Sequence, residues 1–254
     1  MLTRFAPSPT GYLHLGHAFA AEQAFAFGPC LLRIEDIDTT RSRPELTAAI
    51  YEDLRWLGFD WPEPVRVQSD HLADYAGVID ALDARGLLYR DYRTRSGRED
   101  RSLPPVVKLS TVRAVAALGT DRLSFMEDDR EVAVDLSTLE DKTVIRRDIG
   151  TSYHIAVTHD DWRQGVTDVV RGADLFEKTR VHVLIQTLMG WPVPRYHHHP
   201  LIMESEGKKM SKRTGSLTIR ALREKGLSAR DVLAQARERA RERARGMAGG
   251  LPKR

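Results

Sequence analysis

The order of apolar stretches at the start of the chain constrains its fold more than any other feature. Leu2–Ala6 predicts a short strand, Pro7–Gly16 a loop rich in proline and glycine, His17–Phe27 an apolar helix, and Cys30–Ile34 a second strand. A strand followed by a helix and then by another strand is typical of a parallel sheet whose faces are covered by helices. The start of the chain therefore predicts an α/β, Rossmann-like core.

Helix signals continue this pattern. Ser42 is placed to cap the next helix, with Glu45 three residues later as in a capping box, and Gly58 is placed to end it. Another helix is expected over about His71–Arg85, ending at Gly86. Both helices fit the expected faces of a parallel sheet.

The sheet pattern weakens after residue 90, where a polar stretch has no clear period, and it returns near residue 142. We expect residues 1–90 to form the first half of a nucleotide-binding core, 91–141 an insertion, 142–203 the second half, and 204–254 a basic loop with C-terminal helices. The later elements are expected as strands at Thr143–Arg147, Val166–Val170 and His199–Met203, and as helices at about Asp174–Met189, Thr218–Lys225 and Ala229–Arg245.

Composition excludes several classes of protein. Of the 254 residues, 41% are hydrophobic and 30% charged, so the chain can bury a core and is not a disordered polymer. No apolar run approaches the roughly 20 residues of a membrane-spanning helix, and the N-terminus lacks the layout of a secretory signal. A single cysteine, Cys30, leaves no internal disulfide. We expect a cytoplasmic protein without a membrane partner, and a monomer.

The net charge is only +3, from 39 basic and 36 acidic residues, so clustering matters more than the total. The densest cluster is Arg237–Arg245, in which arginine alternates with glutamate and alanine. Two interpretations stay open for it: a solvated helix with charge pairs along its surface, or a contact with RNA phosphates.

Two loops carry residues suited to phosphate chemistry. After the first strand, His14-Leu15-Gly16-His17 places two imidazoles and a glycine at a helix N-terminus, which attracts phosphate through its free N–H groups and dipole. After the last strand, a Gly-flanked loop has the sequence Lys208-Lys209-Met210-Ser211-Lys212-Arg213, whose lysines and arginine are mobile cations that suit a departing polyphosphate. Taken alone, each loop also fits an ordinary polar surface.

Together, HLGH and KMSKR resemble the two signatures of class I aminoacyl-tRNA synthetases. Further segments narrow the resemblance to the glutamyl/glutaminyl branch: Arg4–Gly11 (RFAPSPTG), Arg33–Asp38, Tyr153–Val157, Asp160–Trp162, Val170–Leu175 and Tyr196–Leu201. These matches occur in order from residue 4 to residue 213, so chance agreement does not explain them.

Within that branch, about forty residues follow Arg213, fewer than the anticodon-binding region of an ordinary glutamyl-tRNA synthetase. The chain therefore resembles the glutamyl-Q tRNA(Asp) synthetases, which attach glutamate to the queuosine base. The resemblance implies ATP, L-glutamate and the anticodon stem-loop of tRNA(Asp) as partners. A minimal or truncated glutamyl-tRNA synthetase acting on the 3′ end of tRNA(Glu), another adenylyl-transferring enzyme, and a non-catalytic RNA-binding paralogue stay as alternatives.

The resemblance also implies roles for single residues. His14, His17 and Lys212 are the expected catalytic residues. The expected glutamate site consists of Arg4, Phe5, Ala6, Pro7, Ser8, Glu35, Tyr153 and Arg171, in which Arg4 pairs with the γ-carboxylate and Glu35 with the α-ammonium group. The expected ATP site consists of His14, Gly16, His17, Lys209, Met210, Ser211, Lys212 and Arg213. Mg²⁺ is expected to arrive with ATP.

The sequence departs from the family at one metal site. Many members hold zinc in the insertion with Cys-x-Cys after a Leu-x-Tyr strand, plus a tyrosine and a third cysteine. Here Asp91 and Arg93 take the two cysteine positions, and no cysteine follows. Arginine does not ligate a cation, and structural zinc usually needs thiolates. We expect no zinc and no other metal-ligating residues. The run His197–His199 is expected to be structural and to line the nucleotide site, and not to bind metal, since adjacent side chains on an extended segment face opposite ways.

Overall fold

A computed structural model of the chain describes residues 1–94, 96–202 and 218–248. Three parallel strands form its first sheet: β1 (Thr3–Phe5), β2 (Cys30–Ile34) and β3 (Arg66–Val67). β1 pairs with β2 in the register Thr3 opposite Cys30. The predicted position of β2 is confirmed residue for residue.

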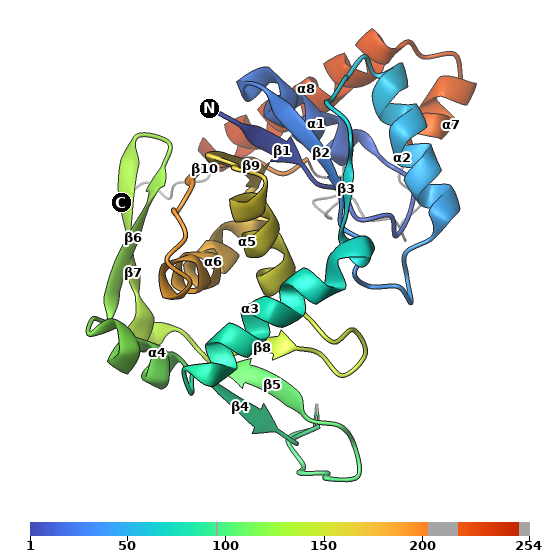
Figure 1. The fold of residues 1–254 in the computed structure, drawn as a ribbon. Coiled ribbons are helices and arrows are strands. Elements are labelled where there is room, and N and C mark those ends of the chain that lie inside the picture. The colour runs from blue at the N-terminus through green and yellow to red at the C-terminus, as the bar shows by residue number, and fades with distance from the viewer. Residues whose placement is uncertain (95, 203–217, 249–254) are drawn as a thin grey trace.

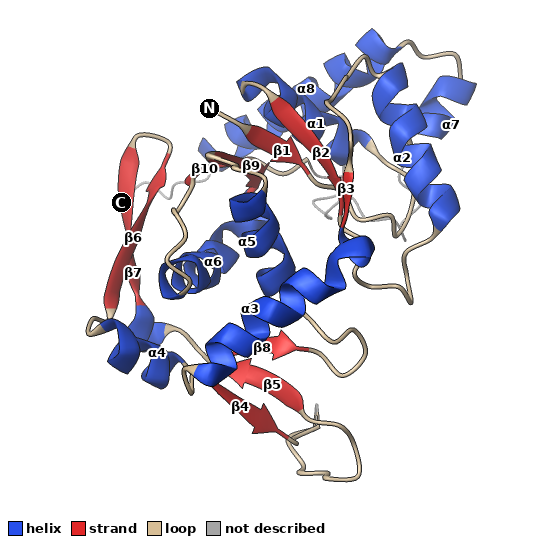
Figure 2. Ribbon diagram, viewed as in Figure 1, coloured by secondary structure: helices blue, strands red, loops and turns tan. Residues whose placement is uncertain are grey.

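A second sheet continues the first. Its order is β7-β6-β10-β9, with β9 at Asp168–Gly172, β10 at Arg195–His199, β6 at Arg122–Glu127 and β7 at Arg130–Asp135. β10 is parallel to both β9 and β6. The two sheets meet where the backbone N–H groups of Thr167 and Asp168 donate to the Leu2 carbonyl at 2.9 and 3.1 Å. β9 therefore lies beside β1, and the two halves of the chain form one layer (Figure 2).

Helices cover both faces of this layer (Figure 1). On one side α1 (Leu15–Phe27) packs on β1 and β9, and α8 (Ala229–Ala248) packs on α1. On the other side lie α5 (Tyr153–Arg163) and α6 (Phe176–Leu188). Side chains alternate accordingly: Phe5 belongs to the core around α1, while Arg4 reaches α5. The predicted α/β core of a parallel sheet with helices on both faces is confirmed.

The remaining elements surround α5 and α6. α3 (Leu72–Ala84) contacts α5, and α4 (Thr111–Leu118) leads into the β6–β7 hairpin, which contacts α6 (Figure 1). A third, antiparallel sheet has the order β4-β5-β8, with strands at Leu88–Asp91, Val106–Leu109 and Lys142–Ile145. Three short 3-10 helices lie at Gln68–His71, Leu136–Thr138 and Ala173–Leu175. β6 comes from the predicted insertion, yet it pairs with β10 of the core.

Two predicted details are wrong. Helix α2 (Pro44–Trp56) takes Arg43 as its N-cap without a side-chain capping bond, and the Ser42 hydroxyl is buried without a hydrogen-bond partner. The strand predicted at His199–Met203 lies earlier, because β10 ends at His199.

The predicted helix after the basic loop is confirmed as α7 (Ile219–Glu224), which Thr218 caps. Across the described residues, no helix combines the length and the apolarity that a membrane span requires.

Candidate active site

A cavity of about 510 Å³ opens at the carboxyl ends of β1, β2 and β9, where open α/β sheets bind their ligands. All predicted site residues in the described part of the chain line it: Arg4, Phe5, Ala6, Pro7, Ser8, His14, Gly16, His17, Glu35, Tyr153 and Arg171. Thr10, Asp174 and Lys178, to which the sequence assigned no role in the site, also line it, as does His199 of the histidine run. The predicted Lys209, Met210, Ser211, Lys212 and Arg213 lie outside the described residues.

The two histidines of the HLGH motif form a reciprocal cap at the start of α1. Nδ1 of His14 accepts from the Gly16 N–H at 3.1 Å, and Nδ1 of His17 accepts from the His14 N–H at 3.2 Å. Because each Nδ1 accepts, each neutral ring carries its proton on Nε2. The pair therefore combines Nε2–H donors with the positive end of a helix, which suits an anionic ligand.

Gly16 is required by this cap. A Cβ atom at this position would lie 2.9 Å from Cε1 and 3.1 Å from Nδ1 of His14, closer than real Cβ contacts. Any side chain would displace the His14 ring from its capping bond. The glycine predicted to admit a nucleotide thus also allows the imidazole to fold back on the helix.

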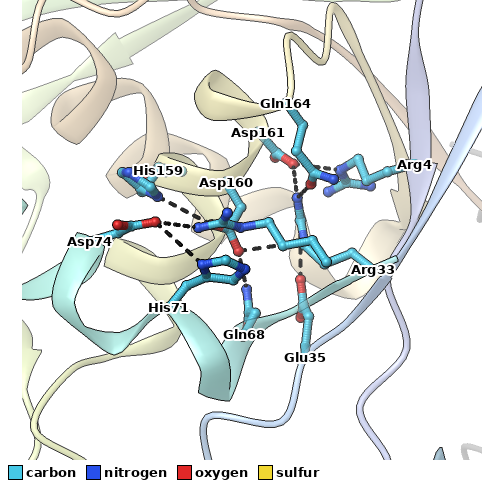
Figure 3. Close-up of polar contacts among 12 residues, drawn as sticks. Arg4, Arg33, Glu35, Gln68, His71, Asp74, His159, Asp160, Asp161 and Gln164 are labelled. Carbon is cyan, nitrogen blue, oxygen red and sulfur yellow. Dashed lines mark hydrogen bonds and ion pairs between the residues drawn. The ribbon is translucent and has the colours of Figure 1, made fainter. Parts of the chain in front are cut away.

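A buried charge network connects Arg4 and Glu35, which line the cavity, to residues behind them (Figure 3). Oδ1 of Asp161, on α5, accepts from Nε of Arg4 at 2.9 Å and from Nη1 of Arg33 at 2.8 Å. Arg33 also donates from Nη2 to Glu35 at 3.2 Å. Arg33 is fully buried, so its charge is balanced entirely by protein groups. The Nη2 group of Arg4 makes no hydrogen bond within the part of the chain that the structure describes.

The preceding aspartate organises the other side of the network. Asp160 is fully buried and accepts from Arg66 at 2.7 Å, and from Gln68 and Tyr75 at 2.9 Å each. Burial alone would raise its pKa, but His159 and the arginines outweigh burial and lower the pKa to about 2. Sequence reasoning used Asp160 and Asp161 only as part of a family motif. Two adjacent aspartates followed by a tryptophan were the available signal of a buried ion network.

Glu35 contributes a negative charge to the cavity. Burial raises the pKa of its carboxyl above the usual value, although Arg33 and Arg4 oppose this shift. Burial and the nearby Glu35 also raise the pKa of Tyr153 to about 12, so the phenol keeps its proton as a hydrogen-bond donor. Glu35 and Tyr153 together suit a ligand that brings an ammonium group.

Arg171, near the carboxyl end of β9, is held firmly in the wall of the cavity. Its guanidinium donates to His198 and His182 at 3.1 Å each and to Thr179 at 2.6 Å. It also lies 5.1 Å from the centre of the Tyr196 ring. Only 6% of the residue is exposed, so this cation is fixed in place before any ligand binds.

A second histidine continues the contacts of Arg171. His182 Nε2 lies 3.1 Å from Nδ1 of His154. Burial lowers the pKa of His154 to about 4 and that of His182 well below its usual value, with Arg171 adding to the shift at His182. Both rings are therefore neutral near pH 7, so they add no positive charge to that of Arg171.

The described residues on either side of the segment 203–217 lie at the cavity and at the HLGH loop. Pro200, Leu201 and Ile202 line it, and Thr218 forms a β-bridge with His14. The Ile219 N–H donates to the Leu13 carbonyl at 2.9 Å. The chain thus leaves the cavity before the KMSKR sequence and returns to the HLGH loop after it.

The residues at the family's zinc position do not fit a metal site. The Asp91 carboxylate accepts two hydrogen bonds from the Arg93 guanidinium, at 3.0 and 2.9 Å, and lies 2.7 Å from Nζ of Lys108. Its oxygens are thus occupied by two cations that would repel a metal ion. Elsewhere Cys30 is buried in β2, and burial raises the pKa of its thiol to about 12. No group of three potential ligands is present among the described residues.

Comparison with known proteins agrees with this geometry. The family model of the class I tRNA synthetases (E and Q), catalytic domain, matches residues 1–102 and 108–241. The chain is 39% identical to a glutamyl-Q tRNA(Asp) synthetase of Rhodobacter capsulatus over 91% of its own length and 98% of the relative's. It is 37% identical to glutamate–tRNA ligase 2 of Gluconobacter oxydans over 92% of its length, but spans 60% of that protein.

A solved structure gives the same result for the fold. The crystal structure of a glutamate–tRNA synthetase from Elizabethkingia anophelis matches 85% of this chain and 53% of its own, with a TM-score of 0.70 and 27% identity. The resemblance inferred from the motifs is confirmed. The chain belongs to the class I aminoacyl-tRNA synthetases, in the family of glutamyl and glutaminyl catalytic domains.

Proposed function

We propose that the chain activates L-glutamate with ATP and transfers the glutamyl group to the queuosine base of tRNA(Asp). One observation carries the first part: Arg4 and Glu35, of opposite charge, line one cavity and are bridged by Arg33 and Asp161. A cavity with a fixed cation and a fixed anion suits a ligand with both an acidic side chain and an ammonium group.

In the first step the α-carboxylate of glutamate attacks the α-phosphorus of ATP, and pyrophosphate leaves with the electrons of the broken P–O bond. The carboxylate is already a nucleophile, so positioning and charge stabilisation supply the catalysis. His14, His17 and the N-terminus of α1 bind the phosphates. Lys212, helped by Lys209 and Arg213, neutralises the leaving pyrophosphate. Mg²⁺ enters with ATP.

The substrate is oriented by charged side chains that line the cavity. Arg4 binds the γ-carboxylate through its Nη2 group, and Arg171 adds a second positive charge. Glu35 accepts from the α-ammonium group, and Tyr153 contributes its hydroxyl. A guanidinium prefers a carboxylate to a neutral amide, so glutamate is preferred to glutamine.

The second step transfers the glutamyl group to the RNA. Similarity to the Rhodobacter protein over nearly all of that protein's length favours tRNA(Asp) and its queuosine base as the acceptor. A hydroxyl on the cyclopentene ring of queuosine attacks the adenylate and releases AMP. A base in an anticodon loop lies outside a duplex, where proteins read RNA most readily. The chain acts as a monomer.

ATP–pyrophosphate exchange tests the activation step. Exchange without tRNA should depend on glutamate and be far weaker with glutamine or aspartate. Arg4→Ala should lower exchange by roughly thirtyfold or more, because losing a buried charged partner costs about 2–5 kcal/mol. Arg122→Ala, at a side chain that is 68% exposed, is the matched control and should leave exchange unchanged. Equal exchange with glutamine contradicts the assignment of the site. Failure of every amino acid to support exchange favours a different adenylyl-transferring enzyme.

Transfer of labelled glutamate tests the acceptor. We expect labelling of tRNA(Asp) from cells that make queuosine, and none of tRNA(Asp) from cells that do not. Removing the 3′-terminal adenosine should leave this labelling intact. Labelling of tRNA(Glu) at its 3′ end would instead identify a minimal glutamyl-tRNA synthetase. RNA binding without exchange or transfer would identify a non-catalytic paralogue.

A further inference from the structure

We propose that Glu127, at the end of β6, is a positioning residue for Arg171: it fixes the tautomer of His198, whose other nitrogen then accepts from the guanidinium. The inference rests on the proposed function, in which Arg171 faces the glutamate substrate. It assigns a role in substrate binding to the β6–β7 hairpin, which the sequence placed in an insertion outside the core.

The carboxylate of Glu127 clamps His198 at two points. One oxygen accepts from the backbone N–H of His198 at 2.9 Å, and the other lies 2.7 Å from Nδ1 of its ring. The side chains are 16% and 3% exposed. Because a carboxylate can only accept, the short contact at Nδ1 requires the imidazole proton on that nitrogen.

The opposite nitrogen of the ring then points its lone pair at the cavity wall. Nε of Arg171 donates to Nε2 of His198 at 3.1 Å. A guanidinium has no acceptor, so this bond exists only while Nε2 is unprotonated. Thr179 fits the same assignment: its hydroxyl accepts from Arg171 at 2.6 Å and lies 3.3 Å from Nε2. The series of hydrogen bonds from the Glu127 carboxylate through the His198 imidazole to the Arg171 guanidinium therefore has one consistent set of proton positions.

Packing holds the ring in this orientation. Phe176 meets His198 edge to face at 5.1 Å between centroids, and Tyr196 lies nearly parallel to it at 6.0 Å. Burial lowers the pKa of His198, although Glu127 opposes the shift. The ring is therefore neutral near pH 7, and a neutral ring can serve as acceptor for Arg171.

Glu127→Gln tests the proposal with almost no change in size. If the amide oxygen keeps the backbone N–H of His198, the amide nitrogen donates to Nδ1, and the ring proton moves to Nε2 opposite the Arg171 N–H. We expect KM for glutamate to rise roughly ten- to a hundredfold, the effect of losing a hydrogen bond to a charged group, with kcat little changed. Asp128→Asn is the matched control, because its carboxylate contacts the neighbouring His197 at 2.7 Å and is 72% exposed. It should change neither constant.

Nitrogen NMR of the His198 ring shows which ring nitrogen carries the proton, and it does not depend on an activity assay. The His198 signals are assigned by their loss in His198→Gln. The unmodified chain should carry the proton on Nδ1, and Glu127→Gln should carry it on Nε2. A proton on Nε2 or a charged ring in the unmodified chain overturns the proposal even if the variant fails to fold. A shifted tautomer with unchanged KM also overturns it. If the tautomers behave as expected but the unmodified chain shows no glutamate exchange, the positioning role stands and the proposed substrate is wrong.

Discussion

Arg4 and Asp161 are 157 residues apart in the sequence, yet they form an ion pair of 2.9 Å between β1 and α5, with both side chains about 5% exposed. The same carboxylate oxygen accepts from Arg33. Burial alone would raise the pKa of Asp161, but Arg4 and Arg33 outweigh it and hold the pKa below its usual value. One anion thus keeps two buried cations in place under the cavity.

Asp161→Asn should lower the free energy of unfolding by about 3–5 kcal/mol, because it removes one partner of buried ion pairs and leaves the cations unbalanced. The full loss of stability is expected near pH 7. A carboxyl group whose pKa is lower in the folded than in the unfolded state stabilises the fold above the unfolded-state pKa, and this contribution decreases as the pH falls through the folded-state pKa. Urea unfolding followed by circular dichroism measures it.

The control is Asp148→Asn. Asp148 pairs with Arg146 at the surface, with side chains 47% and 42% exposed. Solvent screening limits such a pair to about 1 kcal/mol or less. Similar losses in both variants would contradict the claim that the buried network carries the stability.

The arrangement of the cavity could be predicted from the sequence because strand and loop follow one another directly. Arg4 lies on β1, the HLGH motif starts the next helix, and Glu35 follows β2. Carboxyl ends of parallel strands meet at one edge, so residues just after them converge. Residue-level roles came from the family resemblance, not from this spacing.

Other elements could not be predicted because tertiary contacts, and not the local sequence pattern, determine them. β10 has the sequence Arg-Tyr-His-His-His, which is polar, and it is a strand because β9 and β6 pair with both of its edges. The Ser42 cap was wrong because Pro44 begins α2, which makes Arg43 the N-cap. Helix α5 buries Asp160 and Asp161, so the spacing of its apolar residues alone does not predict which face of the helix is buried.

The raised pKa of Glu35 predicts a pH dependence of activation. Only the ionised carboxylate forms an ion pair with the substrate ammonium group, and its ionised fraction grows as the pH rises through the raised pKa. The value of kcat/KM for glutamate in the exchange reaction should therefore rise with pH, with a midpoint above 4.5. Glu35→Gln should remove this acid limb and lower exchange at all pH values. A midpoint at or below 4.5, with the fold intact by circular dichroism, would contradict the role.

The insertion should be stabilised by ion pairs and not by zinc. We expect purified protein to contain no stoichiometric zinc and a chelator to leave its melting temperature unchanged. Asp91→Asn removes the anion shared by Arg93 and Lys108, and should lower the melting temperature by about 2–4 °C, the shift that 1 kcal/mol causes in a chain of this size. Elemental analysis and thermal unfolding measure both. A sharp loss of stability on chelation that added zinc restores would show the prediction to be wrong.

Lys212 should act on the rate of activation and not on the binding of glutamate. It lies in the segment 203–217, whose neighbours Ile202 and Thr218 are held at the cavity and at His14. A cation that meets the leaving pyrophosphate stabilises charge which develops in the transition state. Lys212→Ala should therefore lower kcat for exchange by about a hundred- to a thousandfold, with KM for glutamate changed by less than about twofold. Lys225→Ala, just after α7, removes an equal charge at an exposed position and should have no effect. Weakened glutamate binding at an unchanged rate would place Lys212 in the amino-acid site, against its proposed role.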